Sequence, residues 1–211
     1  MKAAIFDFDG TLFDSMCVWK DIDLVFLAEH GHAPTAEMRE MISDMSVWEA
    51  AELFKRSFDI ALSTEEMVRR FSEIAAVRYR DLVIPKPYVR EYLEILHGLQ
   101  IPICIATACS SQNVISALTR ENMINFFDFI LTADEIKTGK TNPEIYLVCA
   151  SRFDLLPEDI MVFEDSLHCI KTAKNAGFIV TAIEDSYSLP DKNEITKTAD
   201  RYISTWKELI I

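Results

Sequence analysis

Short apolar runs recur along the chain, and each ends in a cluster of polar or turn-forming residues. The runs occupy residues 3–6, 101–107, 128–132, 160–163 and 178–183. Each is four to seven residues long, a length that suits a strand better than a helix. Because polar residues do not alternate with the apolar ones, we expect these strands to be buried on both faces of a parallel sheet.

Between these runs, apolar residues recur every three or four positions, which predicts helices with one buried face. The predicted helices are Tyr88–His97, Asn113–Asn122, Pro143–Phe153 and Ser166–Ala176. Pro143 suits the start of a helix, Ser166 an N-cap and Gly177 a C-cap. Strands that alternate with helices predict an α/β fold, in which a Rossmann-like parallel sheet is covered by helices on both faces.

Residues 15–84 interrupt this alternation and predict helices without a convincing strand. These helices are Met16–His30, Ala36–Ser43, Val47–Phe58 and Thr64–Arg80, with Ser46 and Ser63 as expected N-caps. We therefore expect two domains: a Rossmann-like core of residues 1–14 and 85–211, and an inserted helical domain of residues 15–84. Within the core, residues 191–200 are expected to be exposed, and residues 202–211 to form a short closing element.

Charge narrows the range of partners. The 211-residue chain carries 34 Asp and Glu against 21 Lys and Arg, a formal net charge of −13. Such a field repels nucleic acid and anionic membranes, so we expect neither as a partner. The longest apolar run, residues 101–109, has about nine residues, whereas a membrane span needs about 20. With no signal peptide and five cysteines that form no CxxC pair, we expect a soluble, cytoplasmic protein with reduced thiols.

Polar side chains gather where the predicted strands end. Asp7 and Asp9 follow the first strand, Thr107 ends the second, Lys140 follows the third, and Glu164 with Asp165 follows the fourth. In an open parallel sheet the carboxyl ends of the strands form one edge, where ligands bind. Clustered carboxylates repel one another unless a cation lies among them, and their hard oxygen atoms favour Mg²⁺. A lysine, a threonine hydroxyl and the backbone N–H groups of Ala108 and Cys109 could hold phosphate oxygens beside that cation.

This set of groups suits phosphoryl transfer through a covalent intermediate. A carboxylate beside bound Mg²⁺ is a plausible nucleophile toward phosphorus, and Asp7 takes that role here. If the strand continues past Asp7, Asp9 points the same way and can protonate the leaving oxygen and then activate water. The expected reaction is hydrolysis of a phosphate ester through an aspartyl-phosphate.

Four features of the chain resemble, in the same order, the four signature motifs of the haloacid dehalogenase-like superfamily. They are Asp7-Phe-Asp-Gly-Thr11, Thr107, Lys140 and Phe163-Glu-Asp-Ser166. The chain is similar to that superfamily from residue 7 to about residue 184, and the inserted helices resemble its helical cap. The resemblance implies that Asp7 is the nucleophile and a Mg²⁺ ligand, and that Asp9 is the general acid/base, with its backbone carbonyl on the metal. It implies that Thr107 and Lys140 bind phosphate and that Asp165 ligates the metal, with Glu164 as a less certain second acid.

The resemblance implies a Mg²⁺-dependent phosphatase whose helical cap selects a small phosphorylated metabolite, such as a sugar phosphate or a phosphoglycolate-like acid. A β-phosphoglucomutase-like phosphomutase is the alternative, although such mutases carry a histidine near the position of Trp19. A non-catalytic phospho-receiver module is a remote alternative. Receivers carry two adjacent acids and a phosphorylated aspartate on a later strand, whereas Asp7 and Asp9 are two positions apart at the first predicted strand and the helical insertion follows. The chain also departs from the family at Tyr88 and Cys169, where glycine is common, and at Thr141, where proline is common.

Overall fold

The computed structural model describes residues 1–15, 18, 21–35, 38 and 47–210. The chain divides into two compact units. Residues 1–15 and 83–211 form the larger unit, and residues 16–82 form the smaller one.

The larger unit is built on a six-stranded sheet with the order β5-β4-β1-β6-β7-β8. Every neighbouring pair of strands is parallel. The strands are β1 Ala3–Phe6, β4 Ile103–Thr107, β5 Phe129–Thr132, β6 Ile160–Glu164, β7 Ile179–Ile183 and β8 Arg201–Ile203. Because β1 lies between β4 and β6, the strand that the first acidic motif follows occupies the centre of the sheet.

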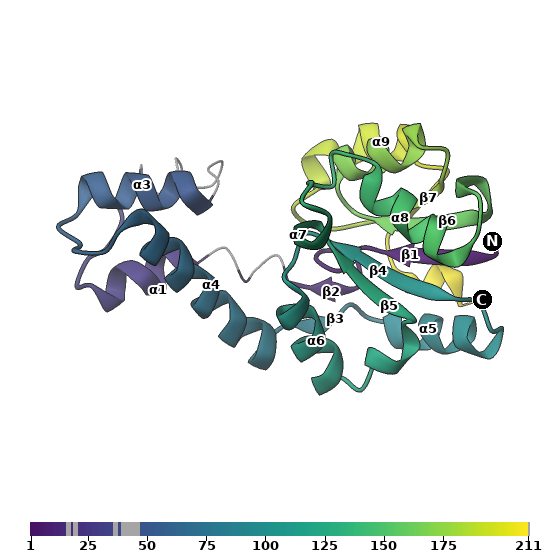
Figure 1. Cartoon of the computed structure of the whole chain (residues 1–211), viewed down its shortest axis with the longest axis horizontal. Helices are drawn as coiled ribbons and strands as arrows, with labels where there is room; N and C mark the ends of the chain where they lie inside the picture. The colour runs from purple at the N-terminus through teal and green to yellow at the C-terminus, as the bar shows by residue number, and fades with distance from the viewer. Residues whose placement is uncertain (16–17, 19–20, 36–37, 39–46, 211) are drawn as a thin grey trace. The chain divides into compact units, whose positions relative to one another are not determined.

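Helices cover both faces of this sheet, as the apolar strands require. In Figure 1, α8 and α9 lie on one face, and α5 and α6 lie on the other. The helices of the larger unit are α5 Val89–Gly98, α6 Ser111–Arg120, α7 Ala133–Ile136, α8 Glu144–Phe153, α9 Leu167–Asn175 and α10 Lys192–Thr198. The parallel α/β architecture expected from the sequence is confirmed.

Successive residues of β1 pack on opposite faces of the sheet. Ala3 and Ile5 pack in a cluster with Tyr146 of α8 and Ile170 of α9. Phe6 faces the other way and stacks on Phe163, with ring centroids 4.6 Å apart. The residue that follows Phe6 therefore lies at the end of a closely packed strand, which constrains the position of its backbone.

In its described residues, the smaller unit contains the helices α1 Ile22–Glu29, α3 Val47–Ser57 and α4 Thr64–Asp81. Phe26, Phe54 and Phe71 bring one aromatic ring from each helix into contact, with centroids 4.8–6.2 Å apart. Ser63 caps α4 through a capping box with Glu66, as expected for an N-cap serine. Within the first predicted helix, residues 16–30, α1 spans Ile22–Glu29, and residues 16, 17, 19 and 20 of that prediction lie outside the described residues. The predicted N-cap Ser46 and nearly all of the predicted helix 36–43 lie outside the described residues.

A small antiparallel ribbon joins the two places where the chain leaves and re-enters the larger unit. Strand β2, Phe13–Asp14, pairs with β3, Ile84–Pro85. The sequence pattern does not predict this ribbon, β8 or helix α10, because each is too short to show a hydrophobic period. None of the helices in the described ranges is long and apolar enough to cross a membrane.

Candidate active site

Asp7 is the first residue after β1, and it is buried at the carboxyl edge of the sheet. Its backbone N–H donates to the carbonyl of Phe163 on the neighbouring strand β6, at 3.0 Å. The Lys140 Nζ donates to Asp7 Oδ1 at 2.6 Å, and both side chains are nearly inaccessible to solvent. The structure therefore brings together two residues that are 133 positions apart in the sequence.

Glu164, the last residue of β6, holds the same lysine from the other side. Its Oε1 accepts from Lys140 Nζ and from the Tyr146 hydroxyl, the latter at 3.0 Å. Its Oε2 accepts from the backbone N–H groups of Asp165 at 3.1 Å and Ser166 at 3.4 Å. Both carboxylate oxygens are thus engaged, and Lys140 is fixed between Asp7 and Glu164.

Asp165 lies beside a turn that contains Gly10 and Thr11. The Thr11 hydroxyl donates to Asp165 Oδ1 at 3.4 Å, and the Trp206 indole N–H donates to the Thr11 carbonyl at 3.2 Å. Gly10 has φ +78°, and a Cβ placed there would lie 2.6 Å from Asp165 Oδ2. Only glycine fits this close approach, which explains why the acidic motif continues with Gly10.

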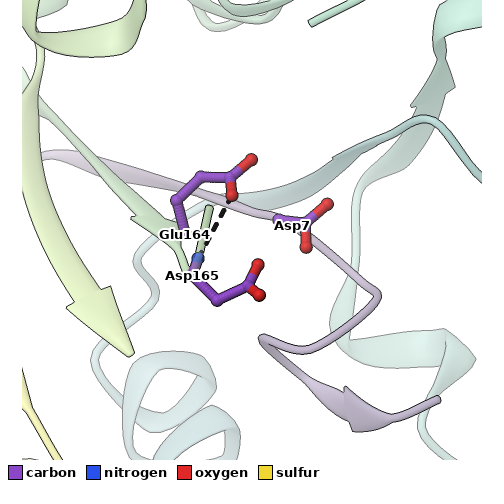
Figure 2. A group of neighbouring side chains, drawn as sticks. All are labelled: Asp7, Glu164 and Asp165. Atoms are coloured by element: carbon purple, nitrogen blue, oxygen red, sulfur yellow. Dashed lines mark hydrogen bonds between the residues drawn. The ribbon is translucent and has the colours of Figure 1, made fainter. Parts of the chain in front are cut away.

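The carboxylates of Asp7, Glu164 and Asp165 form one buried cluster, and one oxygen from each lies within 4.8 Å of the others. Figure 2 shows these three side chains at the ends of β1 and β6. Burial raises the pKa of Asp7 to about 7; Lys140 acts against this effect, and Glu164 and Asp9 add to it. Burial, with Glu164 and Asp7 beside it, also holds the pKa of Asp165 well above its ordinary value. A divalent cation would relieve this repulsion, and the all-oxygen donor set fits Mg²⁺.

Lys140 stays protonated in this environment. Burial alone would lower its pKa, but the negative charges of Asp7 and Glu164 outweigh burial, so the pKa lies well above the ordinary value. A lysine cation is therefore available at the carboxyl edge of the sheet at neutral pH.

Asp9 is placed differently from what the strand pattern predicts. Strand β1 ends at Phe6, and residues 8–12 form a turn in which the Phe8 carbonyl accepts from the backbone N–H groups of Leu12 and of Phe13, the first residue of β2. The expectation that Asp7 and Asp9 share one extended strand is wrong, because this turn begins between them. The Ser15 hydroxyl donates to Asp9 Oδ1, and Asp9 is near enough to Asp7 to raise its pKa.

Thr107 and Ala108 lie at the end of β4, beside β1 in the sheet. The Thr107 side chain is fully buried, and its Oγ1 accepts from the Cys109 backbone N–H at 3.0 Å. That contact uses an acceptor position, so the hydroxyl retains its proton as a donor. Ala108, in contrast, is exposed.

Some residues near the cluster were not predicted as site residues. The Ser15 hydroxyl contacts Asp9, and the Thr11 hydroxyl contacts Asp165. Thr11 belongs to the acidic motif, so the motif could have indicated it. Tyr146 contacts Glu164 from the first turn of α8, and only the tertiary structure shows that contact. The predicted N-cap Ser166 precedes α9, but its hydroxyl contacts His168 Nδ1 at 2.8 Å instead of capping the helix. Trp19 lies outside the described residues.

Comparisons with known proteins show the family and the fold to which the chain is similar. A family model described as haloacid dehalogenase-like hydrolase matches residues 4–183. A phosphorylated carbohydrates phosphatase from Thermotoga maritima is 29% identical over 194 residues, which cover 90% of each chain. The fructose-1-phosphate phosphatase YqaB from Escherichia coli is 26% identical over 82% of this chain and 91% of its own. A crystal structure from Thermotoga maritima, described as a candidate beta-phosphoglucomutase, superposes with a TM-score of 0.83 at 26% identity, covering 100% of this chain and 97% of the other.

Proposed function

The chain belongs to the haloacid dehalogenase-like hydrolase family, and from this premise we propose that it is a Mg²⁺-dependent phosphatase of small phosphorylated metabolites. The observation that carries the proposal is the placement of Lys140 between the carboxylates of Asp7 and Glu164, with Asp165 beside them. A buried cation next to clustered carboxylates suits a phosphate ester, whose oxygens need positive partners and whose phosphorus needs a nucleophile.

Asp7 attacks the phosphorus in the proposed mechanism. The bond between phosphorus and the leaving oxygen breaks, and Asp9 donates a proton to that oxygen. Asp9 then removes a proton from water, which attacks the aspartyl-phosphate, so that inorganic phosphate leaves and Asp7 is regenerated. Thr107, the N–H of Ala108 and Lys140 hold the phosphate oxygens, and the charge of Lys140 favours the anionic form of Asp7 against the effect of burial.

We assign the metal to Asp7 and Asp165, with the backbone carbonyl of Asp9. Bound Mg²⁺ would neutralise the carboxylate cluster and the charge of the transferring phosphoryl group. Glu164 belongs to the same cluster, but its four contacts to Lys140, Tyr146 and two backbone N–H groups suit the role of holding Lys140 better than that of a direct ligand.

The relatives favour a sugar phosphate as substrate. Curated relatives named for phosphorylated carbohydrates and fructose-1-phosphate align with most of this chain. We propose that the smaller unit, residues 16–82, acts as the cap that selects the leaving group. The cytoplasmic location and the absence of nucleic-acid and membrane partners remain predictions from composition.

A phosphomutase is the second candidate, and the likeness to the candidate beta-phosphoglucomutase structure favours it. Such an enzyme would use the same aspartyl-phosphate but return the phosphoryl group to a sugar. Trp19, at a position near which the mutases carry histidine, weighs toward the phosphatase.

The test is phosphate release from a panel of sugar, polyol, nucleotide and short-acid phosphates, with Mg²⁺ or EDTA. We expect release that requires Mg²⁺ and is lost in Asp7→Asn. Asp9→Asn should lower the rate by about 10²–10⁴-fold, the usual contribution of a general acid/base. Asp159→Asn, which changes the same charge at the opposite end of β6, is the matched control and should retain activity.

The outcomes separate the two candidates. Transfer of phosphate to a sugar, with phosphorylated Asp7 but little release into water, would establish the mutase instead. An Asp9→Asn variant with an unchanged rate would remove Asp9 from the acid/base role.

A further inference from the structure

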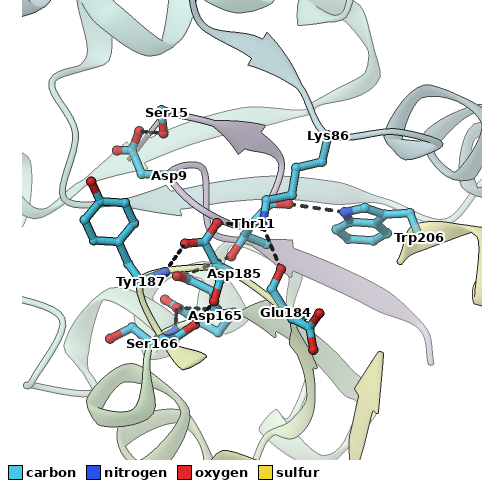
Figure 3. Close-up of polar contacts among 12 residues, drawn as sticks. Asp9, Thr11, Ser15, Lys86, Asp165, Ser166, Glu184, Asp185, Tyr187 and Trp206 are labelled. Atoms are coloured by element: carbon cyan, nitrogen blue, oxygen red, sulfur yellow. Dashed lines mark hydrogen bonds and ion pairs between the residues drawn. The ribbon is translucent and has the colours of Figure 1, made fainter. Parts of the chain in front are cut away.

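Lys86 joins three segments near the carboxylate cluster. It is the first residue after β3, and its backbone N–H donates to the Leu12 carbonyl at 2.9 Å. Its Nζ donates to the Glu184 carbonyl and to Asp185 Oδ2, both at 2.8 Å. Lys86 therefore connects the β2–β3 ribbon and the turn after β1 to the segment that follows β7 (Figure 3).

Asp185 is a buried carboxylate that the proposed mechanism does not use. Only 4% of its side chain is exposed, compared with 13% for Lys86. Its Oδ1 accepts from the Tyr187 backbone N–H at 2.9 Å, so both oxygens are held. Figure 3 shows Asp185 close to Thr11 and Asp165, at the same edge of the sheet.

Asp185 lies beside the carboxylate cluster. Figure 3 shows its side chain next to that of Asp165, close enough for the two carboxylates to repel each other. A buried ion pair contributes little to stability compared with apolar residues of the same volume, so packing alone does not account for this pair. Its location beside Asp165 offers a reason to retain charges there.

Resting on the proposed function, we propose that Lys86 and Asp185 are positioning residues that tune the affinity of the Asp7–Asp165 cluster for Mg²⁺. Asp185 adds negative charge behind Asp165, and Lys86 both fixes that carboxylate in place and offsets part of its charge. Neither side chain contacts the reacting atoms. Outer groups that orient metal ligands commonly change metal affinity by about 10–100-fold when they are altered.

The experiment measures Mg²⁺ binding by calorimetry and by thermal stabilisation, without substrate. We expect Asp185→Asn to weaken Mg²⁺ binding by about 10-fold, the lower end of the range for such groups. Lys86→Met should bind Mg²⁺ more tightly than wild type, because it leaves Asp185 unpaired beside the cluster. The double variant should lie near wild type, and Lys86→Arg, which keeps the charge, should behave as wild type.

Lys2 and Asp159 provide the matched control, because they form an ion pair at the amino end of β6, with Nζ and Oδ2 2.9 Å apart. Lys2→Met and Asp159→Asn make the same charge changes far from the cluster and should leave Mg²⁺ affinity unchanged. Opposite effects of the two single variants are the signature of tuning, since a merely structural pair would weaken binding in both. If Lys86→Met does not fold, the comparison of Asp185→Asn with the double variant and with Asp159→Asn still decides.

Three results would overturn the proposal. These are weaker binding in both single variants, an equal effect of Asp159→Asn, or unchanged affinity throughout while wild type binds Mg²⁺. A wild-type protein that binds no Mg²⁺ would overturn the proposed metal-dependent function as well, which distinguishes the two failures.

Discussion

Gly10 leaves room for the Asp165 carboxylate because it has no side chain. Because a Cβ at Gly10 would lie 2.6 Å from Asp165 Oδ2, Gly10→Ala should displace that carboxylate. We expect roughly a 10- to 100-fold loss of Mg²⁺ affinity, of the size seen when ligand orientation is disturbed. Calorimetric titration of the variant with Mg²⁺ measures this directly.

Gly31→Ala is the control that separates the effect of the close contact at Gly10 from the effect of backbone strain. Gly31 has φ +75°, similar to Gly10, but no atom within 4 Å of a built Cβ. Both alanine variants should lose about 1–2 kcal/mol of unfolding free energy from the left-handed conformation. Equal Mg²⁺ affinity in the two variants would contradict the role assigned to the approach of Gly10 to Asp165.

The Tyr146 hydroxyl is a second residue-scale test. Tyr146→Phe removes one of the four donors to Glu164 and loosens the carboxylate that holds Lys140. A hydrogen bond of this kind is worth about 1–2 kcal/mol, so we expect kcat to fall roughly 10-fold. Steady-state kinetics provide the measurement. Tyr92→Phe alters a buried tyrosine in the aromatic cluster on the other face of the sheet and should leave kcat unchanged; equal losses in both variants would count against the contact.

At the scale of the element, helix α5 begins at an unfavourable residue. Tyr88 precedes it with φ +69°, a left-handed conformation in which a Cβ costs about 1–2 kcal/mol. Glycine avoids this cost, but its greater entropy in the unfolded chain lowers stability by about 0.4–1 kcal/mol. On balance, Tyr88→Gly should have an unfolding free energy about 1 kcal/mol higher than Tyr88→Ala.

Urea unfolding of this pair of variants measures the difference, and the same pair at Glu94 supplies a control of opposite sign. Glu94 lies inside α5 and is exposed, so glycine should be less stable than alanine there by about 1 kcal/mol. If the glycine variant is less stable than the alanine variant at both Tyr88 and Glu94, the backbone at Tyr88 is not strained.

The elements also mark how far the sequence alone could reach. The five longer parallel strands and the helices between them were predictable, because buried runs and helical periods are long enough to read in that part of the chain. Strand β8 was missed because its three residues, one of them Arg201, show no apolar run. Helix α10 was missed because Ile195 is its one buried residue.

The candidate site shows the same boundary. Asp7, Lys140 and Asp165 could be placed together because they follow strands whose carboxyl ends share an edge. The contacts of Tyr146 with Glu164 and of Lys86 with Asp185 join segments 18 and 99 residues apart, and no local pattern encodes them. The turn after Phe6 was missed because Phe8 is also apolar, so the apolar segment extends past the residue at which β1 ends.

For the molecule as a whole, the buried carboxylates make stability depend on pH when no metal is bound. The pKa of Asp7 is about 7 in the folded protein against an ordinary value of 3.8, so the folded state holds this proton more tightly than the unfolded chain does. The contribution of Asp7 to stability is therefore largest at low pH and is lost as pH rises toward and through about 7.

Asp7→Asn cannot make this titration. In EDTA, its unfolding free energy minus that of wild type should increase from about pH 5 to about pH 8. Urea unfolding across that range measures the difference, with Asp159→Asn as a variant that should follow wild type. A difference that stays constant with pH would show that Asp7 is already ionised in the folded protein.

The central position of β1 has a consequence for the order of events on the ribosome. Ala4 pairs with Ile103 and Ala3 with Ile160, so β1 emerges long before either neighbour exists. The helical unit, residues 16–82, is complete before β4 has been translated, and domains commonly fold as they emerge. A nascent chain thus exposes both edges of an apolar strand through most of translation, which invites association with other chains. Chains released before residue 160 should be the ones that depend most on chaperones, and they end before Asp165, so none of them can complete the carboxylate cluster.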